Sequence, residues 1–454
     1  MNFKTTIILA VIFAIGLGVI SLMNKHEAKV QEEKKSEGKL LNITKEKIKE
    51  IILEPSGVHA VKDSNEWKII APVKTDGDKS SLDAIANMFN WAKIERVVSS
   101  DSSEYPEFGL APEKGKLIVV HDAGSDTIYL GDRTPTNSYV FARKSGSPDV
   151  FLTTTSLQTY VEKKLFDLRD KRILVFDKNR VNTIELQNKH GKFVLEKSGG
   201  KWNLISPIKY EADETKVNSI LNRLNSSRIR EFVDEQPKSM KKYGLTRPAY
   251  KLDLLLGTEK AKKTLIVGKK HDGKYYAKDE SKSPVFLVDS SFVKVLNVSL
   301  SDLRSKKISN FKTSDVDSIV LQFADSTLVF KKDTSNTWVL VEPVHKKTKS
   351  WKISSIASTI ANLRVDEFVD DAPRSLVRYG LAKPAARGQF YQNGKLLIDV
   401  MVGKLKDDKV YLKITDKKPV YLVKKYIYEK LRPKLSDLIE EPKAEKKESS
   451  KQQK

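Results

Sequence analysis

A pattern that occurs three times along the 454 residues limits how this chain can fold more than any other feature. Trp67, Trp202 and Trp338 each precede a proline by five residues and the glycine of an aromatic-Gly-Leu sequence by 42 residues. The matching residues are Pro72, Pro207 and Pro343, and then Gly109, Gly244 and Gly380. Because identical offsets recur in three places, the sequence predicts three tandem copies of one structural unit.

Two further markers keep the same period. The first is a glycine that closes an apolar run in each copy, at Gly131, Gly268 and Gly403. The second is an aspartate in the segments FDLRD, SDLRS and SDLIE, which recurs every 135 residues as Asp167, Asp302 and Asp437. These markers place the three copies at residues 45–174, 175–310 and 311–439, each long enough to bury a core of its own.

The segment around each tryptophan has the alternation of a β-strand. In the second copy, Trp202 and Leu204 should face one side of the strand, and Asn203 and Ile205 the other. The proline that follows has no N–H group to donate, so it should end the strand.

A helix should follow this strand in each copy. Asp213 is placed to cap it in the second copy, and the apolar residues after it recur at i, i+3, i+4 and i+7, which is one face of a helix. The three stripes are Leu82, Ile85, Ala86 and Phe89; Val217, Ile220, Leu221 and Leu224; and Ile353, Ile356, Ala357 and Ile360.

The second half of each copy should be a turn, a run of short strands and another helix. A glycine with a proline close behind predicts a turn in which the glycine takes a positive φ. In the second copy, strands are expected at residues 252–256, 264–267, 275–278 and 285–288, after an opening strand pair at 181–186 and 193–196. A second helix should begin near Ser290, and Pro433 should kink the corresponding helix of the third copy or delay its start. The predicted fold class is therefore α+β, with a mainly antiparallel sheet and two helices in each repeat.

The N-terminal segment is predicted to cross a membrane once, as a transmembrane helix ahead of the repeats. Thr5 to Met23 form an uncharged run of 19 residues. As a helix this run is about 28 Å long, close to the hydrocarbon thickness of a bilayer. Residues 1–4 are then a cytoplasmic tail and residues 24–44 a linker. The alternative is a cleaved signal peptide, but the run is longer than usual for one and no A-x-A site follows it.

Two signals disagree about the side of the membrane on which the repeats lie. Only Lys4 precedes the apolar run, whereas five lysines follow it within residues 24–39, a count that favours repeats in the cytoplasm. A short charged tail before an apolar run is, however, typical of export signals, and long domains are translocated despite their charge. We expect a single-pass protein of the bacterial inner (cytoplasmic) membrane with extracytoplasmic repeats.

Basic charge is spread over the folded part of the chain. Of the formal charge of +23, Lys4 and the segments 24–39 and 440–454 contribute one each, which leaves +20 on residues 40–439. This excess favours attraction to an anionic surface or polymer, although an ordinary lysine-rich surface gives the same count. Residues 440–454, EEPKAEKKESSKQQK, are predicted to be a disordered tail.

The sequence offers no constellation typical of catalysis or metal binding. It has no cysteine, which excludes disulfides, thiolate ligands and cysteine nucleophiles. Six histidines lack metal-ligand spacing and share no position between copies: His26, His59, His121, His190, His271 and His345. Ser198-Gly199-Gly200 and Gly268-Lys269 do not complete a phosphate-binding loop. We therefore predict no catalytic, cofactor-binding or metal-binding residues, no cofactor and no enzymatic activity.

Two polar features allow a functional and a structural interpretation. The repeated aspartates could contact a ligand, but aspartates that hold backbone N–H groups at helix ends explain them better. Residues 274–278, KYYAK, could stack on bases or touch anionic headgroups, but an exposed strand with alternating Lys and Tyr is ordinary.

The repeated motifs resemble a known bacterial family. The W-x-x-x-x-P strand, the Y-G-L-x-x-P turn and the apolar run that ends in Gly are similar to the family called domain of unknown function 4340, over residues 45–439. The first copy departs most, with Phe108 in place of Tyr and Pro112 one residue early. Members of this family are typically anchored envelope proteins encoded beside ABC transporter subunits, including proteins similar to gliding-motility auxiliary proteins. The resemblance thus implies a cellular context and brings no catalytic residue with it.

From these features we predict a membrane-anchored extracytoplasmic auxiliary or scaffold protein of an ABC-type transport system, which acts by protein interaction. The alternative is a protein that binds an envelope lipid or polysaccharide. The expected partners are the membrane, ABC transporter subunits and an anionic lipid or glycan, and no nucleic acid is expected for an exported chain.

Overall fold

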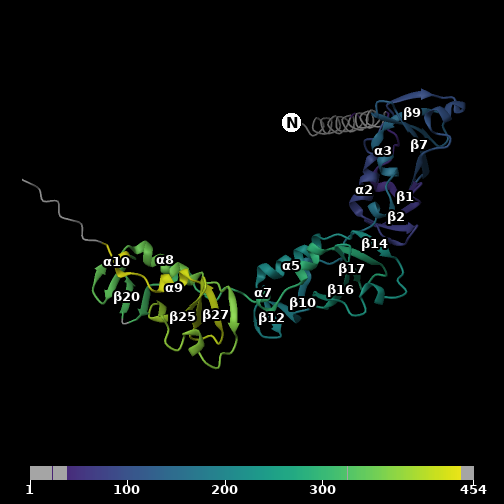
Figure 1. The fold of residues 1–454 in the computed structure, drawn as a ribbon. Coiled ribbons are helices and arrows are strands. Elements are labelled where there is room, and N and C mark those ends of the chain that lie inside the picture. Colours follow the sequence, from purple (N-terminus) through teal and green to yellow (C-terminus); the bar gives the residue numbers. More distant parts are fainter. Residues whose placement is uncertain (1–22, 24–37, 325, 441–454) are drawn as a thin grey trace, which may run out of the picture. The chain divides into compact units, whose positions relative to one another are not determined.

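The computed structural model describes residues 23, 38–324 and 326–440 (Figure 1). It contains three nine-stranded antiparallel sheets with the same strand order, which confirms the α+β class and the three tandem repeats. Residues 5–22 of the predicted membrane span and residues 441–454 of the predicted tail lie outside the described residues. Within the described residues, no helix has the length and apolar character needed to cross a bilayer.

The chain divides into two compact units. Among the described residues, those from 38 to 172 with 228–234 form the first unit, and those from 173 to 227 with 235–440 form the second. The first unit contains the first sheet. The second unit contains the third sheet and, apart from its edge strand at residues 231–234, the second sheet.

The first sheet has the order β4-β3-β2-β1-β6-β7-β8-β9-β5, so two four-stranded meanders meet at the pair β1–β6. Its strands are β1 (Ile48–Glu54), β2 (Val58–Asp63), β3 (Glu66–Ala71), β4 (Thr75–Asp76), β5 (Arg96–Ser99), β6 (Gly115–His121), β7 (Gly124–Arg133), β8 (Tyr139–Lys144) and β9 (Val150–Thr154). Its helices are α2 (Lys79–Met88), α3 (Thr155–Val161) and α4 (Leu165–Leu168). The chain from β4 to β5 includes α2 and passes from one edge of the sheet to the other.

The second sheet repeats this order as β13-β12-β11-β10-β15-β16-β17-β18-β14. Its strands are β10 (Val181–Asn188), β11 (Gly191–Ser198), β12 (Lys201–Ser206), β13 (Tyr210–Glu211), β14 (Glu231–Asp234), β15 (Tyr250–Leu256), β16 (Ala261–His271), β17 (Lys274–Asp279) and β18 (Val285–Asp289). Its helices are α5 (Glu214–Ser226), α6 (Ser290–Leu296) and α7 (Leu300–Leu303).

The third sheet has the order β22-β21-β20-β19-β24-β25-β26-β27-β23. Its strands are β19 (Ser318–Phe323), β20 (Ser326–Lys332), β21 (Trp338–Glu342), β22 (Lys346–Lys347), β23 (Glu367–Asp370), β24 (Ala386–Gln392), β25 (Lys395–Lys406), β26 (Lys409–Ile414) and β27 (Val420–Lys424). Its helices are α8 (Ser350–Ala361), α9 (Tyr426–Leu431) and α10 (Leu435–Leu438).

Each repeat has three α-helices among the described residues, one more than predicted. The additional helix is a single turn that begins at Leu165, Leu300 or Leu435, too short to show a hydrophobic period. Pro433 lies in the connection between α9 and α10, where the other two repeats also break their helix. The predicted kink or late start is therefore wrong, because α10 begins at the position equivalent to the start of α4 and α7.

The main core of each repeat lies between the helices and one face of the sheet. In the third repeat, α8, α9 and α10 gather on one face of the sheet that contains β20, β25 and β27 (Figure 1). Every residue of the three predicted helix stripes is buried, and so are all three repeated tryptophans. Asp213 caps α5 by accepting the backbone N–H of Lys216 at 3.0 Å, as predicted.

A smaller core covers the opposite face of the sheet. In the second repeat, Tyr243 of the aromatic-Gly-Leu turn packs on Tyr276, with ring centroids 5.0 Å apart. Phe108 pairs with Phe141 and Tyr379 with Tyr411 in the same way. The strand at residues 274–278 is therefore not simply exposed, because the side chain of Tyr276 is buried in this second core.

The two repeated glycines of each copy belong to one contact. A Cβ atom on Gly268 would lie 2.2 Å from the carbonyl oxygen of Tyr243, and the same holds for Gly403 and Tyr379. The turn glycines have the predicted positive φ, at 68° for Gly109, 71° for Gly244 and 68° for Gly380. Glycine is therefore required in the strand so that the turn can close onto the sheet.

Packing begins before the predicted boundaries. Leu40 and Leu41, predicted to lie in the linker 24–44, are buried in the core of the first repeat. Ile308, assigned by sequence to the end of the second copy, is buried in the core of the third. Short β-bridges place these segments, since Lys39 pairs with Lys93 and Lys307 with Arg364.

Candidate functional site

Two of the three repeated tryptophans join a strand to the helix that covers it. The indole N–H of Trp67 donates to Asp83 of α2 at 2.8 Å, and that of Trp338 donates to Ser354 of α8 at 3.1 Å. Because buried indole N–H groups need a partner, these bonds explain why a polar residue faces the strand from α2 and from α8. The tryptophans therefore have a structural role.

Two of the repeated aspartates hold helix ends. Asp167 accepts the backbone N–H of Lys164 at 3.0 Å, and Asp302 accepts that of Ser299 at 2.8 Å. Burial raises the pKa of Asp302, but the hydrogen bonds from Ser299 outweigh it and hold the pKa below its ordinary value. The helix-end interpretation is confirmed for these two. Asp437 forms no equivalent hydrogen bond among the described residues.

The histidines lie apart from one another. His59 Nε2 is 2.6 Å from a Glu50 carboxylate oxygen, and His121 Nε2 is 3.0 Å from one of Asp126. His26 lies outside the described residues. Over residues 38–324 and 326–440, no three His, Cys, Asp or Glu side chains gather as metal ligands would. The expectation that no residue is catalytic stays a prediction.

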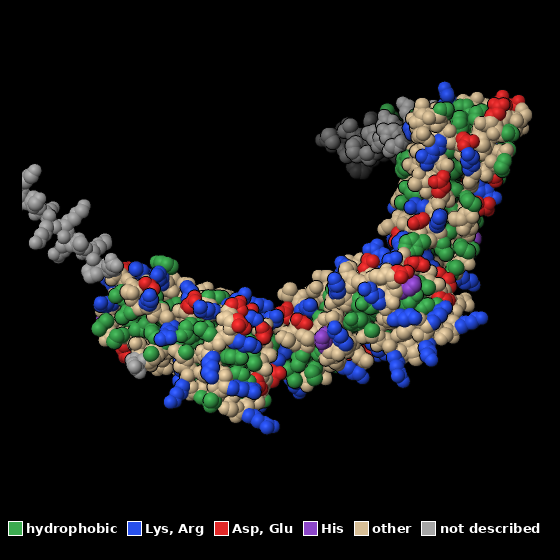
Figure 2. Space-filling view, in the orientation of Figure 1, with side chains coloured by type: hydrophobic (Ala, Val, Ile, Leu, Met, Phe, Trp, Pro, Cys, Tyr) green, Lys and Arg blue, Asp and Glu red, His purple; other side chains and the backbone are tan. Residues whose placement is uncertain are grey.

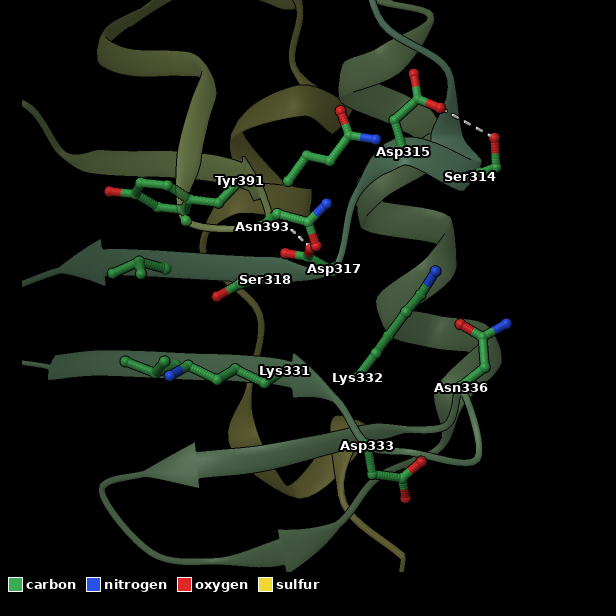
Figure 3. Close-up of a pocket in the computed structure, with 14 residues that line it drawn as sticks. Ser314, Asp315, Asp317, Ser318, Lys331, Lys332, Asp333, Asn336, Tyr391 and Asn393 are labelled. Carbon is green, nitrogen blue, oxygen red and sulfur yellow. Dashed lines mark hydrogen bonds between the residues drawn. The ribbon is translucent and has the colours of Figure 1, made fainter.

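The third repeat contains an open recess of about 820 Å³ beside the turns at one end of β19, β20 and β24 (Figure 3). Its three carboxylates each accept a backbone N–H group from a turn. Asp315, Asp317 and Asp333 bind in this way the N–H groups of Lys312, Asn393 and Thr337. Because these carboxylates stabilise turns, the recess has the character of a polar loop cluster rather than of a reactive centre.

Basic side chains are scattered across the surface. Figure 2 shows Lys and Arg on all three repeats, interspersed with Asp, Glu and other polar residues on the face in view. Many of the cations form exposed ion pairs, such as Lys49 with Asp122 at 2.6 Å. Exposed pairs of this kind contribute little to stability. The attraction of the basic excess to an anionic partner stays a prediction.

A buried cationic and aromatic cluster lies in the second unit where its two repeats meet. Arg304, directly after α7, is 3% exposed, and its guanidinium carbon lies 3.8 Å from the ring centroid of Phe368 and 4.6 Å from that of Tyr210. Its Nη2 donates to a carboxylate oxygen of Asp371 at 2.6 Å. The ring of Tyr421 packs on Phe368 with centroids 5.7 Å apart. The Arg304 side chain is thus enclosed between Tyr210 of its own repeat and Phe368 and Asp371 of the third.

The charge of this cluster is balanced by one carboxylate. Burial, with the neighbouring Tyr210 phenol, raises the pKa of Tyr421 above its ordinary value. Tyr421 therefore remains neutral, and Asp371 is the counter-ion of Arg304. A buried guanidinium is stable only when it is paired and hydrogen-bonded in this way.

The same contact occurs in the first unit, and its residues change at the two ends of the array. The guanidinium carbon of Arg169 lies 3.3 Å from the ring centroid of Phe232, the residue equivalent to Phe368. The first repeat has Val97 at the phenylalanine position, and the third has Ile439 at the arginine position. The arginine is therefore present in the two repeats that are followed by another repeat, and the phenylalanine in the two repeats that are preceded by one.

Sequence reasoning missed this junction, although the sequence carried a signal for it. The segments FDLRD, SDLRS and SDLIE were interpreted through their aspartate, and the arginine two residues later was overlooked. An arginine present in the first two copies and replaced by isoleucine in the last is the pattern of a residue that contacts the next repeat.

Replacing Arg304 by alanine should open the junction and leave both repeats folded. The lost cation–π contacts and charge-assisted hydrogen bond together amount to about 2–3 kcal/mol. Hydrogen exchange should therefore accelerate in residues 304–309, while the amides of the two cores keep their protection. Arg364→Ala is the control, because Arg364 joins Asp213 across the same junction in an exposed pair at 3.4 Å and should change little. Equal protection of residues 304–309 in both variants would contradict the role of Arg304.

The fold defines a class, tandem copies of one α+β repeat, in which an arginine of one repeat contacts a phenylalanine of the next. The family model described as Domain of unknown function (DUF4340) matches residues 67–204, 202–351 and 338–442, and the chain belongs to this family. The matches begin at Trp67, Trp202 and Trp338, inside the third strand of each sheet, so the period of the family model is offset from that of the folded repeat. Comparison with curated proteins finds no match.

Proposed function

We propose that this chain is a membrane-anchored extracytoplasmic scaffold of an ABC-type transport system and acts by binding other proteins. The observation that carries the proposal is the Arg304 cluster. It joins two repeats into one compact unit through a buried contact, so it sets the spacing of surfaces on successive repeats. A fixed series of surfaces is what a scaffold needs.

Two features of the sequence support the cellular part of the proposal. The uncharged run from Thr5 to Met23 is long enough to hold the repeats at a membrane. The resemblance to envelope proteins encoded beside ABC transporter subunits suggests the partner class. The basic surface favours partners with acidic surfaces.

The partner class can be tested by purification from membranes. A full-length chain with an affinity tag after Lys454, expressed in its own cells and extracted in mild detergent, should carry ABC transporter membrane subunits with it. The control replaces residues 1–23 by a cleavable signal peptide, which should leave the repeats folded and lower this recovery because the local concentration at the membrane is lost. Recovery of no transporter subunit with the full-length chain, after chemical crosslinking as well, would refute the scaffold role.

The location can be tested with the same fusion site. Alkaline phosphatase attached after Lys454 should be active, because the enzyme matures only outside the cytoplasm. An inactive phosphatase, together with a fluorescent cytoplasmic reporter at the same position, would show that the five lysines after the span hold the repeats inside.

A further inference from the structure

A groove on the third repeat differs in character from the equivalent surfaces of the other two repeats. It lies between α8, α9 and α10 and has a volume of about 510 Å³. Trp351 and Tyr426 line it, although their side chains are 69% and 52% exposed. Large aromatic side chains left in water at neighbouring positions are typical of binding surfaces.

The other two repeats provide an internal comparison for these aromatic residues. The helix position of Trp351 is occupied by Ser80 in the first repeat and Thr215 in the second. The position of Tyr426 is occupied by Ser156 and Ser291. Because the same fold forms with small polar residues at these positions, packing does not require the aromatic side chains of the third repeat.

Positive charge is concentrated at the same groove. Four cations line it: Lys352, Lys430, Arg432 and Lys434. In the second repeat the equivalent positions carry one cation: they are Lys216, Val295, Asn297 and Ser299. In the first repeat they carry one cation and one acid: they are Ser81, Tyr160, Glu162 and Lys164.

These four cations have no carboxylate partner among the described residues. Lys430 donates to the Ser355 hydroxyl at 2.8 Å, and Arg432 donates to the Tyr428 hydroxyl at 2.6 Å. Two acids also line the groove: Glu429, 4.0 Å from Lys425, and Asp437. Four cations against two acids leave a net positive groove, whose charge complements an anion.

The apolar surface of the groove indicates which kind of anion fits. Ile356 and Leu438 lie at its base but are only 2% and 3% exposed, so the accessible apolar surface comes mainly from Trp351 and Tyr426. An aliphatic side chain of an acidic peptide would bury apolar surface against these two aromatic side chains, a gain that a small inorganic anion does not offer. Trp, Tyr and Arg are also the residues that dominate binding energy in protein interfaces.

We propose that the groove formed by Trp351, Tyr426 and the four cations binds an acidic segment of a partner protein, with an aliphatic side chain packed on Trp351 and Tyr426. This inference deepens the proposed scaffold function and rests on it for the identity of the partner. It assigns the third repeat a docking surface that the first two repeats lack.

Selection of random 12-residue peptides displayed on phage, on the full chain in detergent, tests this inference. Enriched peptides should combine Asp or Glu with Leu, Ile or Val, and their binding should weaken as NaCl rises from 50 to 500 mM. The variant Trp351→Thr with Tyr426→Ser carries the residues of the second repeat and should bind the selected peptides roughly 30-fold more weakly. Its thermal unfolding should match that of the original chain, because both side chains are exposed.

Trp91→Ser is the matched control, since Trp91 is 49% exposed in the first repeat and should not affect peptide binding. Enrichment of no acidic peptide, or equal binding to the double variant, would overturn the inference. The inference would also be overturned if the Trp351 side chain were needed for binding heparin fragments or phosphatidylglycerol vesicles but not for binding peptides. If the double variant loses peptide binding but still recovers transporter subunits from membranes, the scaffold binds its partner through another surface. If the original chain binds peptides but recovers no transporter subunit, the scaffold function is refuted and the peptide site is not.

Discussion

Replacing Trp338 by alanine should lower the free energy of unfolding of the third repeat by about 3–5 kcal/mol. The indole is 2% exposed and lies within the main core, so its removal leaves a large cavity. The change also leaves the Ser354 hydroxyl without the indole N–H that it accepts at 3.1 Å. Hydrogen exchange in urea, followed by mass spectrometry, should show the loss in the third repeat alone, because each repeat has its own core.

Trp351→Ala is a strict control for this change. It removes a side chain of the same type from the same repeat, but the indole of Trp351 is 69% exposed. The free energy of unfolding should therefore change by about 0.5 kcal/mol or less. A similar loss in both variants would mean that Trp338 is not a core residue. In cells, the Trp338 variant should also be less abundant, because unfolded chains are degraded.

Gly403→Ala should cost about 3 kcal/mol, a large effect for the addition of one methyl group. The new Cβ would lie 2.2 Å from the carbonyl oxygen of Tyr379, so backbone must move against backbone and no side-chain rotation can relieve the contact. Since Gly403 itself lacks a positive φ, alanine fits its backbone, and the clash is the whole reason for the loss. Denaturant unfolding of the third repeat measures the effect.

Gly394→Ala separates the clash from backbone strain. Gly394 has a φ of 76° in the turn between β24 and β25, and a Cβ there meets no atom within 4 Å. Alanine at this position should cost only the left-handed conformation, about 1 kcal/mol. If Gly403→Ala lowered the free energy of unfolding no more than Gly394→Ala, the close contact between Gly403 and the turn at Tyr379 would not be required for stability.

The two glycine markers show how far repetition can guide interpretation. Gly244 and Gly268 were each recognised at fixed offsets, one as a turn residue and one as the end of an apolar run. The first interpretation is confirmed by a φ of 71°. Their contact with each other through the carbonyl of Tyr243 joins residues far apart in the sequence, and no local pattern predicted it.

Several features of the fold followed from the sequence alone. The helix stripes, the alternation at Trp202 and the cap at Asp213 are local patterns with the periods of helix and strand, and three copies of each made them secure. The edge strands β4 and β5 were missed because two to four residues are too few to show an alternation. The single-turn helices were missed for the same reason.

The sequence by itself determined that one domain is present three times, which face of its long helix is buried and where its glycine turns lie, because periodicity and turn chemistry are local properties. Only the tertiary structure decided which residues meet at a distance. It enclosed Arg304 among Tyr210, Phe368 and Asp371, and it brought Trp351 and Tyr426 to one groove from two helices that are 64 residues apart in sequence. Both arrangements depend on how helices and strands that are distant in the sequence pack together. A local sequence pattern cannot show which residues that packing will bring into contact.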